Sequence, residues 1–164
     1  MLTPAQQATL KTDILADQTF AALPHNSDGA YVIAEAYKVV VVPEYTVWRS
    51  SVTWDEIMEN GMDFTRVDNL TNGSKWRIWE WLFKNSKNSI NPSKLNHRAG
   101  IDATWVGTQA DLAVRASVYT HCKRPANRAE KLFATGGTGS VADPATMTFE
   151  GNLSYQEVQQ VMGW

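Results

Sequence analysis

SKWRIWEWLFK, from Ser74 to Lys84, is the stretch of sequence that decides the fold. On a helical wheel its charged side chains Arg77, Glu80 and Lys84 fall on one narrow arc, and apolar side chains occupy most of the rest. A helix that is apolar nearly all round has to be buried on several sides. This one is therefore predicted to be either the central helix of the domain or a helix held between the domain and a partner. Three tryptophans then mark the expected centre of the fold: Trp76, Trp79 and Trp81.

Signals for helix starts recur on both sides of this segment. Thr3 precedes a proline, a pairing that favours the first turn of a helix. Thr53 and Ser154 each stand three residues before a glutamate, which is the pattern of a capping box. Apolar residues follow these starts at helical spacing, and residues 146–149 alternate like a short strand. The sequence predicts a mainly α fold, a compact multi-helix bundle with a short β element.

The C-terminal part of the chain is expected to behave differently from the rest. Residues 136–145, GGTGSVADPA, contain three glycines and one proline and predict a flexible loop. We therefore expect a helical domain over residues 1–135 and an extended C-terminal arm over residues 136–164, made of this loop, a short strand and a docking helix. The expected docking residues of the arm are Phe149, Tyr155, Val158, Met162 and Trp164. The alternative for this set is an ordinary helix that covers the core.

Composition and charge restrict the class of protein. With 164 residues and 43% apolar content, the chain fits one globular domain and does not have the composition of a disordered protein. Its longest strongly apolar run, Val39–Val42, is far too short for a membrane helix, so no membrane partner is expected. The net charge of −2 conceals a division into −6 over residues 1–72, +7 over residues 73–131 and −3 over residues 132–164.

The basic segment 73–131 needs an explanation. Arg124, Arg128 and Lys131 have the spacing of one helical face, and Lys123 adds charge beside them. These four residues are the expected contacts to a partner or to DNA. Three interpretations remain open: a nucleic-acid surface, where cations neutralise phosphates and aromatic rings stack on bases; a solvated basic face; or contacts between subunits. In the third interpretation, the acidic first part of one copy meets the basic middle of the next, and such head-to-tail contacts generate rings when the rotation closes.

Motifs that carry chemistry are absent from the sequence. His25, His97 and His121 belong to no metal-binding pattern, and Cys122 has no cysteine partner at metal-ligand spacing. Cys122 is expected to be a buried, inert thiol, because a nucleophilic cysteine needs a general base that the fold brings to it. Residues 136–140 have the composition of a phosphate loop but lack its Lys-Ser/Thr ending. We expect no catalytic residue, no metal and no other cofactor, and therefore a non-enzymatic protein.

Five segments in this order carry a likeness to a known group: YTVWRSSV (residues 45–52), WRIWEW (76–81), INPSK (90–94), RAEKLFATG (128–136) and FEG (149–151). Together they span most of the chain. Their pattern resembles small virion proteins of tailed bacteriophages and prophages that are encoded among head-assembly genes.

The resemblance implies a structural role. By analogy with phage head-to-tail adaptors (neck or connector proteins), it implies a mostly helical subunit in a ring of about a dozen copies beneath the portal. In such adaptors a flexible or C-terminal segment commonly reaches onto the portal or a neighbour, which residues 136–164 would do here. The expected partners are further copies of the chain, the portal protein, a tail or nozzle protein and viral DNA that passes through the ring. The expected location is the virion neck, after assembly in the host cytoplasm.

Two alternatives to the adaptor stay open. One is a nucleic-acid-binding module that uses the basic segment 73–131. The other is a tail-completion or capsid-associated protein, which the same phage resemblance accommodates.

Overall fold

The computed structural model describes residues 1–60, 62–70, 73–85 and 87–164, and it divides the chain into two compact units. Unit 1 consists of Met1–Val47 and Pro125–Trp164, and unit 2 of Trp48–Arg124. The described residues contain ten helices and six short strands, which pair as three two-stranded sheets. The predicted mainly α class is confirmed. The predicted boundary at residue 135 is wrong, because the chain returns to unit 1 for its last forty residues.

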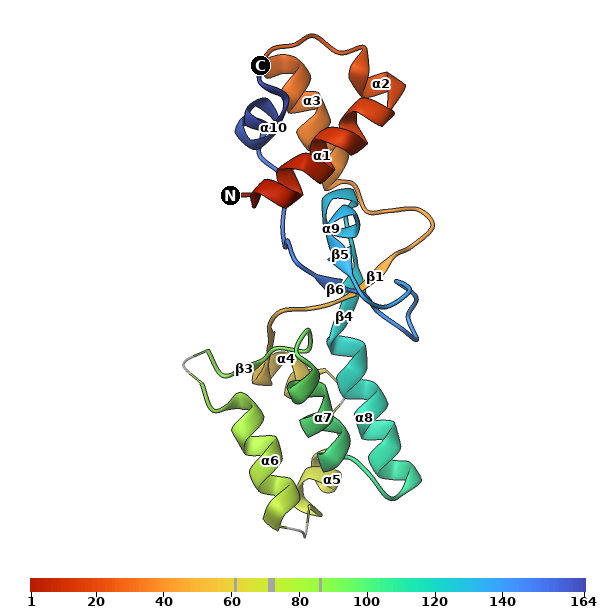
Figure 1. Cartoon of the computed structure of the whole chain (residues 1–164). Helices are drawn as coiled ribbons and strands as arrows, with labels where there is room; N and C mark the ends of the chain where they lie inside the picture. The colour runs from red at the N-terminus through yellow and green to blue at the C-terminus, as the bar shows by residue number, and fades with distance from the viewer. Residues whose placement is uncertain (61, 71–72, 86) are drawn as a thin grey trace. The chain divides into compact units, whose positions relative to one another are not determined.

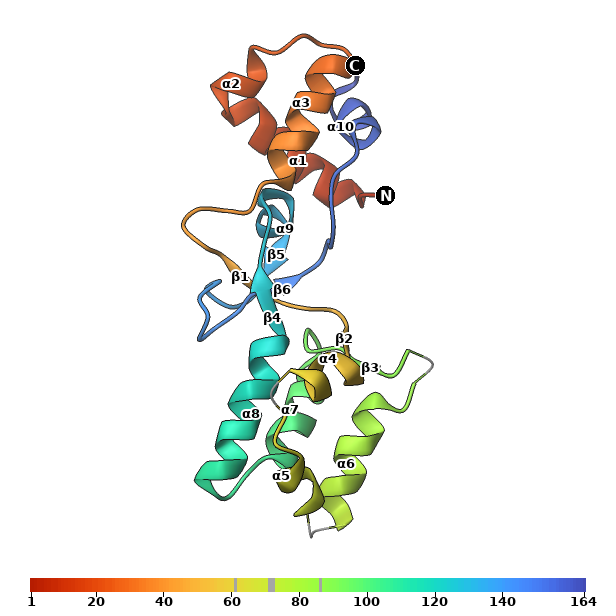
Figure 2. The same ribbon diagram turned by 180° about the vertical axis from the view of Figure 1, so that it is seen from behind.

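Unit 1 is built around three helices from the two ends of the chain. α1 (Pro4–Ala16) begins at the predicted cap, Thr3, and α10 (Tyr155–Met162) begins at the predicted capping box of Ser154. α10 packs against both α3 (Ser27–Lys38) and α1, and all three helices contribute side chains to one core (Figures 1 and 2). Two shorter helices complete the unit, α2 (Gln18–Ala21) and α9 (Arg128–Leu132).

The core of unit 1 shows that residues 136–164 do not form an arm. Leu153 and Val158 are fully buried in one cluster with Leu10, Ile14 and Ile33 of the first helices. Apolar side chains from both ends of the chain are buried in the same core. This shared burial holds α10 against α1 and α3. The prediction of an extended C-terminal arm is therefore wrong, and its alternative, a helix that covers the core, describes the structure.

The glycine-rich loop of unit 1 is held at several points. β5 (Ala134–Thr135) and β6 (Thr146–Met147), at either end of it, pair antiparallel, with Ala134 opposite Met147. Within the loop the Gly139 carbonyl accepts from the backbone N–H of Thr46 at 2.7 Å. A Cβ on Gly139 would lie 2.1 Å from the Tyr45 ring, so only glycine fits this approach. The loop is fastened to the unit, contrary to the flexible loop expected from its glycines.

The chain passes between the units in two paired strands. β1 (Thr46–Trp48) leads from unit 1 into unit 2, and β4 (Lys123–Pro125) leads back. The two strands are hydrogen-bonded neighbours in one sheet.

Unit 2 is a second helical unit with its own core. Its helices are α4 (Trp54–Glu59), α5 (Phe64–Asp68), α6 (Gly73–Phe83), α7 (Leu95–Thr104) and α8 (Gln109–His121). β2 (Val52–Thr53) and β3 (Ser89–Ile90) pair antiparallel beside them. α7 lies between α6 and α8 in both views (Figures 1 and 2). α6 and α7 approach closely because residue 100 is a glycine, whose Cβ would lie 2.9 Å from Leu82.

Buried tryptophans lie at the centre of the unit 2 core. Of the three tryptophans on α6, one belongs to that core. Trp79 is fully buried, with ring centroids 5.0 Å from Phe83 and 5.3 Å from Trp105. Trp76 and Trp81 are 40% and 66% exposed. The prediction that all three tryptophans mark the centre of the fold is wrong for these two. α6 packs on the unit through one face, and the interpretation of a helix that leaves a face for a partner remains.

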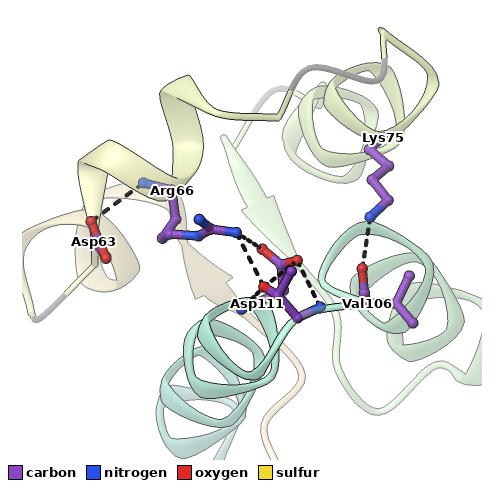
Figure 3. A network of polar contacts seen from close by, with 6 residues as sticks. Asp63, Arg66, Lys75, Val106 and Asp111 are labelled. Carbon is purple, nitrogen blue, oxygen red and sulfur yellow. Dashed lines mark hydrogen bonds and ion pairs between the residues drawn. The ribbon is translucent and has the colours of Figure 1, made fainter.

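An ion pair ties α5 to α8 at the edge of this core (Figure 3). Arg66 donates to the Oδ1 atom of Asp111 at 2.6 Å, and the backbone N–H and hydroxyl of Thr108 donate to Oδ2. The guanidinium of Arg66, followed by the donors of Thr108, lowers the pKa of Asp111 from 3.8 to about 2. On the α6 side, Lys75 donates to the Val106 carbonyl at 2.7 Å.

This lowered pKa predicts that unit 2 loses stability in acid. A depressed carboxyl pKa contributes stability above its unfolded value of 3.8, and that contribution is lost as the pH falls through about 2. We expect a loss of about 1 kcal/mol, since solvent screens part of the pair. Urea unfolding between pH 5 and pH 2 measures it, with the Asp111→Asn variant as control. Equal acid dependence in both proteins would contradict the assignment to Asp111.

Candidate interaction surfaces

The four basic residues expected to face a partner do not share a helical face. Lys123 and Arg124 are half-buried in strand β4, whereas Arg128 and Lys131 belong to α9 in unit 1. The predicted face is wrong because α8 ends at His121 and the chain is extended through Pro125, whose ring does not continue a helix.

Arg128 is engaged inside unit 1. Its guanidinium lies 3.2 Å from the carboxylate of Asp13, which is on α1. It also lies 3.3 Å from the carboxylate of Asp17, the residue that ends α1. It also lies 4.7 Å from the ring centre of Tyr37, whose hydroxyl donates to Asp13. Burial and that hydrogen bond raise the pKa of Tyr37 above its ordinary value. Arg128 thus joins α9 to α1 and α3, and we leave it out of the proposed contacts to other molecules.

Lys131 and Lys123, and with Lys123 also Arg98, lie against aromatic rings. In unit 1, the Lys131 ammonium is 5.5 Å from the ring centre of Tyr45. In unit 2, the Arg98 guanidinium and the Lys123 ammonium lie 4.8 Å and 5.2 Å from the ring centre of Trp48. Such cation–π contacts stabilise a positive charge that stays accessible at one side. Trp48, Arg98 and Lys123 form a cationic, aromatic group, whose two cations belong to the basic segment 73–131 and whose ring lies outside that segment.

The two units of the fold carry net charges of opposite sign. Unit 1 carries 4 Lys/Arg and 9 Asp/Glu, a net charge of −5. Unit 2 carries 11 and 8, a net charge of +3. Five acidic residues of the segment 1–72, from Asp55 to Asp68, belong to unit 2. The difference in net charge between the two units is therefore smaller than that between the segments 1–72 and 73–131, but it remains. Two units of opposite sign are the main electrostatic feature of the molecule.

Four of the five residues expected to dock an arm make contacts within unit 1. Val158 is fully buried, Phe149 packs edge-on against Phe133, and Met162 lies at the margin of the same core. Trp164 stacks on His25 with ring centres 4.8 Å apart. Tyr155 is 39% exposed. The docking partner of this C-terminal segment is the unit's own core.

Helix α6 presents an apolar hollow on the surface of unit 2. Trp54, Trp76 and Phe83 supply aromatic rings around a space of about 350 Å³. The remaining wall of this space, which we call the aromatic hollow, consists of Glu80, Lys84 and Asn88. Apolar hollows of this kind, rimmed by polar groups, mark interaction sites on proteins.

Unit 1 carries a protruding apolar segment, Val39–Glu44, which we call the valine loop. It follows the end of α3 and projects as a wide loop in both views (Figures 1 and 2). Val42 is 92% exposed, and Val39 and Val40 are more than half exposed. The base is fixed by backbone hydrogen bonds from Val41 to Ala126 and from Arg128 to Val39. The loop therefore holds exposed valines in a defined place.

Comparison of the chain with models of known protein families, with curated proteins and with solved structures finds no match. Its function is therefore inferred from its own residues, their geometry and the phage resemblance.

Cys122 is fully buried, and burial raises the pKa of its thiol to about 12, so it stays protonated at neutral pH. Across the described ranges, no three His, Cys, Asp or Glu side chains gather as a metal site. In the same part of the chain, no helix has the length and apolar character needed to span a membrane.

Proposed function

We propose that this chain is a non-enzymatic structural protein of a tailed-phage virion and acts as a head-to-tail adaptor in a ring beneath the portal. The observation that supports this most directly is the pairing of two oppositely charged units in one chain, each with an exposed apolar surface. A molecule with two unlike association surfaces binds copies of itself head to tail, and such contacts form a ring when the rotation between copies closes. The proposed further partners are the portal and a tail or nozzle protein.

The test is to mix the purified protein with the portal and capsid proteins. We expect a ring-sized species that appears when the portal is present, seen by sedimentation and by electron microscopy. Addition of salt is expected to weaken its formation, because opposite net charges assist the association. A chain that stays monomeric in every mixture would contradict the adaptor.

A nucleic-acid-binding module is the second candidate, favoured by the cations Arg98 and Lys123 around Trp48 and by the net charge of unit 2. Binding to single-stranded or duplex DNA that falls steeply with salt, without any ring-sized species, would support it. A tail-completion or capsid-associated role would appear as binding to tail or capsid proteins with no binding to the portal.

A further inference from the structure

We propose that the aromatic hollow on α6 of one copy receives the valine loop of a second copy. This inference rests on the proposed self-assembly and names the two surfaces that make it. The occupant is thus a defined segment of this same chain, Val39–Glu44, presented by unit 1 of the neighbour.

The aromatic hollow, called the socket below, is lined by residues of α6, of α4 and of the segment that follows α6. Trp76, Glu80 and Phe83 follow one another at spacings of four and three along α6, so they share one side of the helix, and Lys84 directly follows its last residue. Trp54 of α4 closes the far wall and meets Phe83 edge-on, with ring centres 4.8 Å apart. Trp76 remains 40% exposed at the opening. Covering solvent-exposed aromatic rings with an apolar group removes apolar surface from water, which stabilises the contact.

The loop has the complementary construction. Val42 and Pro43 stand at its tip as aliphatic groups, and Val42 has almost no contact with its own unit. Backbone hydrogen bonds at its base, including Ala126 N–H to the Tyr45 carbonyl at 2.8 Å, hold the loop in shape before any partner arrives. A preordered segment loses little conformational entropy on binding.

Charge favours the same pairing. Glu44 ends the loop in the acidic unit, and Lys84 stands in the wall of the socket in the basic unit. Among the described residues Lys84 makes no ion pair, and Arg77, which lies on α6 before it, makes none either. Glu80 opposes an incoming carboxylate, so Glu44 is placed against Lys84. The net charges of −5 and +3 guide the two units together over a longer range.

Loop and socket are different surfaces, which determines the symmetry. A contact between two unlike surfaces leaves one free loop and one free socket on every pair, so a third copy can add. Growth ends when the last copy meets the first, which produces a ring. Two like surfaces would instead stop at a two-fold dimer.

The experiment blocks each surface separately. Val42→Asp places a charge at the loop tip, and Trp76→Ser removes one wall of the socket. Sedimentation velocity at low ionic strength, with and without the portal ring, is expected to show self-association weakened by about tenfold or more in each variant. Leu15→Asp in unit 1 and Trp81→Ser on α6 are matched controls, since both alter exposed apolar residues outside the proposed contact. They are expected to assemble like the wild type.

Mixing the two blocked variants gives the sharpest result. Each retains the surface that the other lacks, so the mixture is expected to form a 1:1 pair and stop there. A second test reverses the charges: Glu44→Lys and Lys84→Glu each weaken assembly, and the double variant restores it. This readout depends on residues that are exposed in the folded chain, so misfolding does not mimic it.

Several outcomes would overturn the pairing. If the wild type assembles and both blocked variants assemble equally well, the interface lies elsewhere while the adaptor proposal stands. If the wild type never assembles, with or without the portal, both proposals fail. If Trp76→Ser leaves assembly intact but abolishes binding of a single-stranded oligonucleotide, the hollow is a base-stacking site.

Discussion

Deletion of residues 136–164 is expected to unfold unit 1 while unit 2 stays folded. The deletion removes Leu153, Val158 and Val161 from a core that they share with α1 and α3. Burial of each such side chain contributes about 1.5–3 kcal/mol. Their combined loss is comparable with the whole stability of a small domain, about 5–15 kcal/mol. The deletion also removes the Gly151 N–H donor that contacts the buried Glu130.

Hydrogen exchange resolved by peptide is the appropriate measurement. Amides of residues 1–38 are expected to lose protection in the truncated protein, and those of α7 and α8 to keep it. In the full-length chain Val158→Asp is expected to act in the same direction, with the exposed neighbour Gln160→Asp as its matched control. Cooperative unfolding of an intact unit 1 in residues 1–135 would restore the model of a separate C-terminal arm.

Substitution Trp79→Ala is expected to lower the free energy of unfolding of unit 2 by about 3–5 kcal/mol. The indole is fully buried and meets the rings of Trp54, Phe83 and Trp105 at centroid distances of 5.8, 5.0 and 5.3 Å. Its removal leaves a cavity that these neighbours fill in part. Helices α4, α6 and α7 lose their common contact at once.

The matched control is Trp81→Ala, the same change two residues further along the same helix. Trp81 is 66% exposed, and we expect its loss to change the free energy of unfolding by less than about 0.5 kcal/mol. Urea unfolding followed by circular dichroism compares the two variants. Equal losses would mean that α6 is buried on both faces, as the helical wheel alone suggested.

Local features were predicted well from the sequence because their causes are local. The caps at Thr3, Thr53 and Ser154 depend on residues three apart, and all three are present with reciprocal hydrogen bonds. The mainly α class follows from the helical spacing between such caps. Cys122 is buried as expected, since a lone cysteine behaves as a small apolar residue.

Long-range features were not predictable in the same way. A helical wheel shows that α6 is apolar, but which tryptophans are buried depends on the side on which α7 packs. The return of the chain to unit 1 after Arg124 leaves no local signal, because residues far apart in the sequence share that core. Arg128 was assigned to a basic face, whereas its partners Asp13 and Asp17 lie more than 100 positions earlier.

Val39–Val42 illustrates how one segment acquires a different interpretation. In the sequence its four valines served only to exclude a membrane helix. In the structure Val40 forms an isolated bridge with Asn127, and the next residues leave the unit as an exposed tip. Exposure of consecutive aliphatic groups on an ordered base is a property of the fold, and it directs attention to a partner.

Sedimentation velocity of the wild-type chain, over a range of protein concentrations at low and at high salt and with and without the portal ring, tests the central claim most directly. That claim is head-to-tail association of copies through units of opposite charge. The account predicts species larger than a dimer that grow with concentration at low salt and recede when salt is added. A single monomeric species under all conditions, or association that stops at a two-fold dimer, would contradict it.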